Sequence, residues 1–149
     1  MNRTRYIQTA LLSMACLYAA HTQAECKGSQ NLPSEQHQVA FKSNESDISQ
    51  SERARLNDWI TLVNSRYAIQ NWITIIGSAA DREQESKQLA MRRAVTVAQE
   101  ALGDGLVNAP LQIKVQIYPV ANTEPIDSES REVTVQLSPG CPDNCCDGQ

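Results

Sequence analysis

The segment GSAADREQESKQLAMRRAVTV (residues 77–97) decides how this chain folds. It follows an apolar run, WITII (residues 72–76), and its second half carries small apolar residues at helical spacing. Aromatic and β-branched residues favour strands, whereas apolar residues that recur every three or four positions favour a helix. We therefore predict a strand, central in a sheet or covered on both sides, that ends at Gly77 and is followed by a helix.

The predicted helix runs over residues 81–102. Asp81 is a candidate N-cap, and Gln84 three residues later completes a pattern close to a capping box. Gly103 is expected to end the helix. Small apolar residues form one stripe along it, which suits close packing on a sheet: Leu89, Ala90, Ala94, Val97, Ala98 and Ala101.

The rest of the chain supplies three more strands and one more helix. Short or alternating apolar patterns predict strands over residues 38–41, 111–120 and 132–137. A helical pattern follows Ser51, a plausible N-cap, and ends near residue 65. The order is β-α-β-α-β-β, which predicts an α/β fold, specifically an α+β two-layer sandwich with a mixed sheet and the helices on one face. We expect both tryptophans, Trp59 and Trp72, in the core.

The first residues have the pattern of a secretory signal peptide. Two arginines precede the apolar segment ALLSMACLYAA (residues 10–20), and Ala24 suits cleavage. The apolar segment is too short to span a bilayer, so we expect no transmembrane segment in the mature chain. Lipidation at Cys16 is the alternative. The predicted divisions are a signal peptide (1–24), a polar leader (25–37), a folded domain (38–137) and a cysteine-containing tail (138–149).

Composition limits the class of partner. The whole chain has 17 acidic and 13 basic residues, and its net charge is −4. Removal of the signal peptide takes away Arg3 and Arg5 and no acidic residue, so the mature chain is more acidic still. An acidic domain without basic clusters argues against nucleic acid as a partner.

Four cysteines remain after the expected cleavage: Cys26, Cys141, Cys145 and Cys146. An even number in an exported chain predicts disulfides. A bond between the neighbours Cys145 and Cys146 would need a strained ring. We therefore expect Cys26 to pair with one of them and Cys141 with the other, joining the start of the mature chain to its end. A zinc ion held by four thiolates is the alternative.

Several motifs, taken in order, resemble the OmpA-like domain, a periplasmic module that binds peptidoglycan. VAF (residues 39–41) is similar to the opening V-x-F strand of that family, and the strand ending at Gly77 is similar to its I-x-I-x-G. LAMRRAVTV (residues 89–97) is similar to L-S-x-x-R-A-x-x-V, and SREV (residues 130–133) lies where the family has N-R-R-V. The resemblance covers residues 38–137.

The resemblance implies a ligand-binding pair, Asp81 and Arg93. In the family, an aspartate and an arginine grip the diaminopimelate of the peptidoglycan stem peptide. Arginine offers a two-pronged fork to a carboxylate, and aspartate can hold an ammonium group. The chain departs from the pattern in the loop: the family aspartate position is Ala80, and Asp81 comes one residue later. These departures predict a divergent member with weakened binding.

Each candidate also has a plain structural interpretation. Asp81 could act only as an N-cap, and Arg93 could lie on a solvated helix face, where its neighbours at three and four residues offer no carboxylate. The sequence contains no metal-ligand triad, nucleophile motif or phosphate-binding glycine loop. We therefore expect no enzyme activity, no cofactor and no metal.

The leading functional hypothesis is a non-catalytic, periplasmic cell-wall binding module associated with the cell wall or the outer membrane. Its expected partner is peptidoglycan, contacted through Asp81 and Arg93. The alternative is a protein-protein interaction component of an envelope, secretion or conjugation complex, which keeps the fold without binding peptidoglycan. Loss of the family's loop glycine and asparagine favours that alternative.

Overall fold

The computed structural model describes residues 26–121 and 125–146. The predicted signal peptide and Cys16 lie outside the described residues. The order of the main elements is the predicted β-α-β-α-β-β. They are β1 (Glu35–Ala40), α2 (Gln50–Arg66), β2 (Gln70–Ala80), α3 (Ser86–Gly103), β3 (Leu111–Tyr118) and β4 (Glu132–Pro139). Two short 3-10 turns, Glu129–Arg131 and Pro142–Asn144, flank β4.

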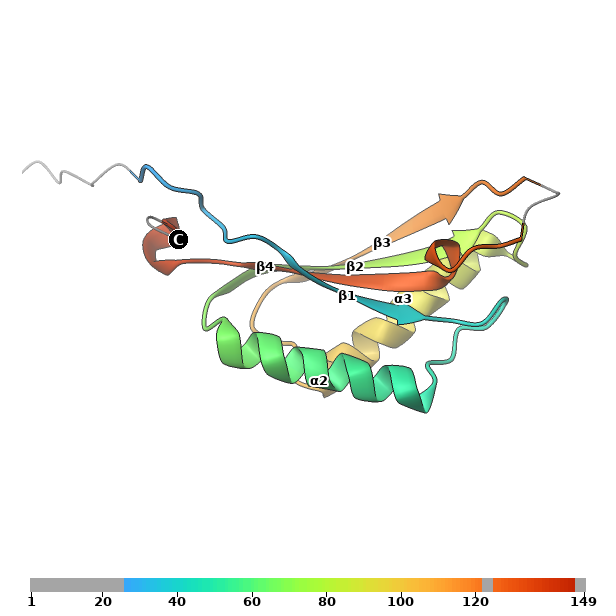
Figure 1. The fold of residues 1–149 in the computed structure, drawn as a ribbon, viewed down its shortest axis with the longest axis horizontal. Coiled ribbons are helices and arrows are strands. Elements are labelled where there is room, and N and C mark those ends of the chain that lie inside the picture. The colour runs from blue at the N-terminus through green and yellow to red at the C-terminus, as the bar shows by residue number, and fades with distance from the viewer. Residues whose placement is uncertain (1–25, 122–124, 147–149) are drawn as a thin grey trace, which may run out of the picture.

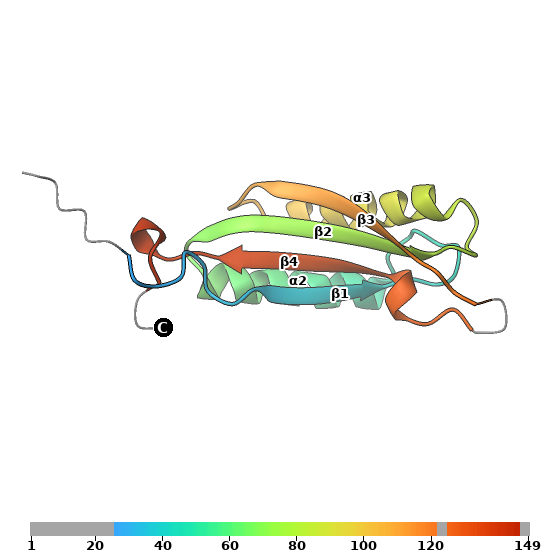
Figure 2. The same ribbon diagram turned by 90° about the horizontal axis from the view of Figure 1, so that it is seen from above.

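The four strands form one mixed sheet in the order β1-β4-β2-β3. Strand β2 is parallel to β3, because α3 crosses between them, and antiparallel to β4. Both helices lie on the same side of the sheet (Figure 1). Among the described residues, no α-helix covers the opposite side, as the view from above shows (Figure 2). The predicted two-layer sandwich with a mixed sheet is confirmed.

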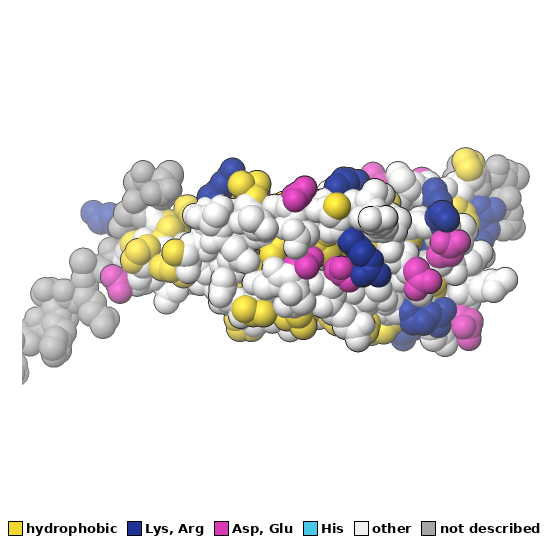
Figure 3. All heavy atoms as spheres, turned by 90° about the horizontal axis from the view of Figure 1, so that it is seen from below, with side chains coloured by type: hydrophobic (Ala, Val, Ile, Leu, Met, Phe, Trp, Pro, Cys, Tyr) yellow, Lys and Arg dark blue, Asp and Glu magenta, His cyan; other side chains and the backbone are white. Residues whose placement is uncertain are grey.

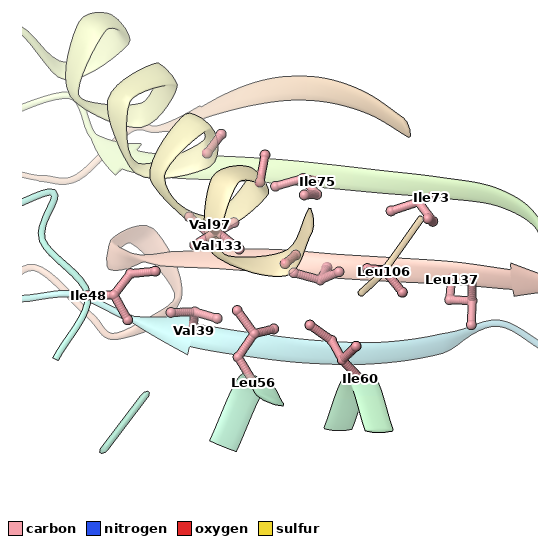
Figure 4. Close-up of a cluster of buried hydrophobic side chains, with 14 of the residues drawn as sticks. Val39, Ile48, Leu56, Ile60, Ile73, Ile75, Val97, Leu106, Val133 and Leu137 are labelled. Atoms are coloured by element: carbon pink, nitrogen blue, oxygen red, sulfur yellow. The ribbon is translucent and has the colours of Figure 1, made fainter. Parts of the chain in front are cut away.

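The core lies between the sheet and the two helices. Leu56 and Ile60 of α2 point toward Val39 of β1 and Leu137 of β4, and Val97 of α3 lies over the sheet (Figure 4). Every member of the predicted small-residue stripe on α3 is buried. Burial of this apolar surface is the main force that holds the two layers together.

The close approach of α3 to β2 depends on Gly77. A β-carbon at this position would lie 2.8 Å from the β-carbon of Ala94 and closer still to the carbonyl oxygen of Ala90. The prediction that Gly77 ends the strand is therefore wrong: β2 continues to Ala80. Glycine is needed here for contact with a helix rather than for a turn.

Three other boundaries differ from the predictions. Strand β1 begins at Glu35, inside the predicted polar leader, because residues 35–40 pair with β4. Helix α2 is capped by Ser49, whose hydroxyl accepts a hydrogen bond from the Glu52 amide, and not by Ser51. Helix α3 begins at Ser86, so Asp81 is not its N-cap.

The prediction that both tryptophans lie in the core is correct only in part. Trp59 of α2 packs against the core, whereas Trp72 is 51% exposed. Strand β2 alternates: Ile73 and Ile75 face the helices and Trp72 faces the side that carries none. The sheet is covered on one side only, so a continuous apolar run does not bury all its members.

Candidate ligand-binding site

Arg93 is the largest fully buried side chain among the described residues, with 0% exposure. Its position on α3 explains this burial: Leu89, Ala90 and Val97, at three and four residues, belong to the buried stripe. The helix therefore carries the guanidinium into the space between the end of β2 and two loops, residues 42–47 and 81–85. The alternative in which Arg93 lies on a solvated helix face is wrong.

All five N–H groups of the Arg93 guanidinium have acceptors. Three of them donate to backbone carbonyl oxygens, those of Glu45 at 2.8 Å, Ser78 at 2.8 Å and Lys42 at 3.1 Å. The other two donate to the carboxylate of Glu83, at 2.7 and 3.0 Å. The cation also lies 5.5 Å from the centre of the Phe41 ring. Arg93 is thus a fully satisfied, buried cation.

Glu83 is the anion of this pair and is itself only 4% exposed. Besides Arg93, its carboxylate accepts hydrogen bonds from the backbone N–H groups of Asn44 at 2.8 Å and Ala80 at 3.0 Å. Burial alone raises the pKa of Glu83, but the hydrogen bonds from Arg93, Asn44 and Ala80 outweigh it and bring the pKa below its ordinary value. The carboxylate is therefore held in its charged form.

Two positive φ angles shape the loops around this pair. Asn44 has φ of 59° and Glu85 has φ of 48°, and asparagine adopts this left-handed region more readily than most residues. The side-chain oxygen of Asn44 accepts a hydrogen bond from the Gln84 amide at 2.8 Å, which joins the two loops directly. The loops thus close over the Glu83–Arg93 pair from two sides.

Asp81 lies at the same end of the domain but belongs to a different set of contacts. Its side chain is exposed and accepts a hydrogen bond from the Val120 amide at 3.2 Å. Its own amide donates to the Tyr118 carbonyl at 2.9 Å. Both contacts fix the turn after β2 to the end of β3. The structure brings Asp81 and Arg93 to one end of the sheet without pairing them.

An open hollow of about 420 Å³ lies between the end of β1 and the start of α2. Its lining includes Lys42 and Glu45, whose carbonyl oxygens hold Arg93. Three carboxylates (Glu45, Asp47 and Glu52) and one ammonium group (Lys42) border it. A ligand in this hollow would meet charges of both signs, but neither Arg93 nor Glu83 lines it.

Sequence reasoning missed Glu83, which lies ten residues before Arg93. Helical spacing points only to the neighbours at three and four residues, whereas Glu83 belongs to the loop before the helix. The usable signal was the spacing of Arg93 itself: it falls in the buried stripe of α3, and a buried arginine requires an anion.

The opposite end of the domain is closed by two disulfides. Cys26 pairs with Cys145 and Cys141 pairs with Cys146. Each of the neighbouring cysteines therefore bonds elsewhere, as expected, and the first of the two bridges joins the start of the described chain to its end. The thiolates that the zinc alternative needs are all used in these bonds.

The described residues hold no group of three or more histidine, cysteine, aspartate or glutamate side chains placed to bind a metal ion. Over the same residues, no helix has the length and apolar character needed to cross a bilayer. On the face that carries the helices, acidic and basic side chains are interspersed rather than gathered by sign (Figure 3).

Comparison with known proteins finds the fold in solved structures. The OmpA-like domain of FopA1 from Francisella tularensis superposes with a TM-score of 0.52 at 13% identity, covering 72% of this chain and 73% of that one. The chain has the OmpA-like fold.

Two further OmpA-like structures extend the comparison. The peptidoglycan-associated lipoprotein from Burkholderia pseudomallei has a TM-score of 0.53 at 19% identity, covering 68% of this chain and 87% of that one. The cell wall anchor of the T6SS from Pseudomonas aeruginosa has a TM-score of 0.53 at 13% identity, covering 71% and 82%. No protein-family model and no curated protein matches the sequence. The likeness at these identities establishes the fold.

Proposed function

We propose that this chain is a non-catalytic, periplasmic cell-wall binding module that contacts the diaminopimelate of peptidoglycan through Asp81 and Arg93. The OmpA-like fold supports the proposal, as do two structural neighbours, a peptidoglycan-associated lipoprotein and a cell wall anchor. The signal-like start of the chain and the two disulfides agree with a periplasmic location.

One observation carries the proposal to the level of chemistry. Arg93 already binds a carboxylate through two parallel hydrogen bonds, which is the geometry that a ligand carboxylate requires. In this chain Glu83 supplies that carboxylate. Because the other three N–H groups of Arg93 donate to backbone carbonyls, a peptidoglycan carboxylate must displace Glu83, and we expect weaker binding than an open arginine would give.

The test is retention of the purified protein on isolated sacculi. Asp81 is the residue to change, because it is exposed and its loss leaves the core intact. We expect the unmodified protein to be retained and free diaminopimelate to release it. Asp81→Ala should abolish this retention. Asp58→Ala is the matched control, since Asp58 is an exposed aspartate on α2. Failure of the unmodified protein to be retained would contradict the proposal.

The second candidate is an interaction component of an envelope complex that keeps this fold without a peptidoglycan site. The full burial of Arg93 favours it, because every donor of that side chain is already used inside the domain. Two results together would select this candidate. The protein would co-purify with an envelope protein even as Asp81→Ala, and it would not be retained on sacculi.

A further inference from the structure

Trp72 lies near the start of β2, whereas Arg93 contacts Ser78 near the end of that strand. Because side chains alternate along a strand and Ile73 lies in the core under the helices, Trp72 faces the side of the sheet that carries no helix. It is 51% exposed, and β2 pairs it with Ser138 of β4. Its indole N–H has no acceptor among the described residues. A large aromatic side chain on an open face is a common element of binding sites, because it offers much apolar area together with a polar group.

A shallow hollow of about 400 Å³ surrounds this tryptophan. Its lining consists of Trp72 with three amide side chains and one hydroxyl: Gln30, Asn31, Asn71 and Ser138. The chain has 30 residues of the Asp, Glu, Lys and Arg types, yet none of them lines the hollow. The hollow is therefore uncharged, and its hydrogen-bonding groups are amides and a hydroxyl, which both donate and accept.

The terminal segments hold this hollow in shape. Asn31 belongs to the arm before β1, which the Cys26–Cys145 disulfide and the hydrogen bond from the Leu32 amide to the Pro139 carbonyl tie to the end of β4. The Asn71 side chain donates to that of Asn31 at 2.6 Å. Gly140 leaves room for Asn71, since a β-carbon there would lie 2.5 Å from its side-chain oxygen.

The two disulfides thereby have a second role besides stabilising the fold, which is to position the arm before β1. The arm is almost entirely polar and exposed, so burial of apolar surface alone would hold it weakly. The bridges fix it against β2 and β4, where it supplies two of the amide groups of the hollow. A binding site whose groups are already in place loses less entropy when a ligand binds.

We propose that the Trp72 hollow binds an uncharged sugar ring of an oligosaccharide. A pyranose ring presents an apolar face of C–H groups that can stack on the indole, and its hydroxyl and acetamido groups pair with amides. Phosphate or carboxylate ligands would require a cation, and the lining supplies none. This inference stands independently of the proposed contacts of Asp81 and Arg93, because it uses the other end of the sheet.

The experiment is a titration of the ¹⁵N-labelled, oxidised protein with the tetramer of N-acetylglucosamine, with cellotetraose and maltotetraose as other neutral sugars. We expect amide shifts centred on residues 30, 31, 71, 72 and 138 with at least one of the three. Trp72→Ala should weaken this binding by about tenfold or more, and Asn31→Ala should weaken it without altering the fold. Met91→Ala is the control, since Met91 is 43% exposed on α3.

Three results would overturn the inference. One is the absence of shifts with all three sugars, and another is binding that is unchanged in Trp72→Ala. The third is binding of a charged oligogalacturonate in preference to the neutral sugars. None of these results bears on retention through Asp81, so the two proposals fail separately.

Discussion

At the scale of single residues, the Glu83–Arg93 pair holds together the end of the domain at which β2 ends. It joins four segments: the loop after β1, the end of β2, the loop before α3, and α3 itself. A buried ion pair adds little to stability when compared with apolar residues of the same shape, but removing one partner leaves an uncompensated buried charge. Both members must therefore be kept or lost together.

Glu83→Gln should lower the free energy of unfolding by about 3 to 5 kcal/mol, because Arg93 would lose its counter-charge in a buried position. The double variant Glu83→Gln, Arg93→Met should lose less than the sum of the two single variants. Urea unfolding of the four proteins measures this coupling. Additive losses would show that the two side chains act independently.

The same pair predicts how stability depends on acid. Burial raises the pKa of Glu83 in the folded protein, but hydrogen bonds from Arg93 and from two backbone amides outweigh this effect. The pKa therefore lies below its ordinary value. The Glu83 carboxylate therefore stabilises the fold at pH values above the pKa of the unfolded chain, near 4.5. This stabilisation is lost as pH falls through the pKa of the folded protein. Glu83→Gln should flatten the stability profile in this acidic range. An unchanged profile would contradict the assignment.

His37 predicts a separate transition at higher pH. Its ring stacks on Trp59 at 5.6 Å, and its Nε2 is buried without a partner. Burial, and then the positive charge of Arg55, lower the pKa of His37 below 6.5. As pH falls, His37 therefore binds a proton in the unfolded chain before it does so in the folded protein. The free energy of unfolding should fall as pH drops below about 6.5 and should level off below the pKa of the folded protein. His37→Phe should remove this step in thermal unfolding curves, whereas a step that persists would contradict it.

The Glu83–Arg93 pair also marks the limit of what the sequence reveals about the site. The position of Arg93 could be read from a family motif, and its burial from the spacing of Leu89, Ala90 and Val97. The partner could not, because the loop from Asp81 to Glu85 bends through a left-handed residue that no pattern indicates. That bend brings Glu83 into direct contact with Arg93, ten residues later in the chain.

At the scale of elements, the packing of α3 on β2 was predictable and the length of β2 was not. The stripe of small residues indicated close approach, and all its members are buried. The sequence predicts a strand end at Gly77, because glycine commonly interrupts strands. Only the three-dimensional contact with Ala90 and Ala94 shows that α3 can pack this closely because Gly77 has no side chain.

Gly77→Ala should therefore destabilise the domain by about 1 to 3 kcal/mol, the usual cost of overpacking. Gly103→Ala is the matched control: a β-carbon there meets nothing within 4 Å, at the last residue of α3. It should leave the midpoint of unfolding unchanged or raise it slightly. Equal effects of the two substitutions would show that α3 does not approach β2 as described.

At the scale of the whole molecule, the two ends of the sheet differ in how they are held together. Buried polar contacts close the end near Arg93, and covalent bonds close the end near Trp72. The chain-entropy relation gives about 5 kcal/mol for the bridge that spans 119 residues and about 2 kcal/mol for the bridge that spans five. Cys26→Ser with Cys145→Ser should thus cost more stability than Cys141→Ser with Cys146→Ser, as measured by denaturant unfolding. The reverse order would contradict this account of the terminal arm.

The proposed function rests on whether a peptidoglycan carboxylate reaches Arg93 in competition with Glu83. The most direct measurement is an NMR titration of the Arg93 Nε–H resonance with a stem peptide that contains diaminopimelate. We predict that this resonance and the amides of residues 81–85 shift in the unmodified protein, and that the shifts are lost in Asp81→Ala but kept in Asp58→Ala. An Arg93 resonance that stays unchanged at saturating peptide would contradict the proposal that this buried arginine binds the cell wall.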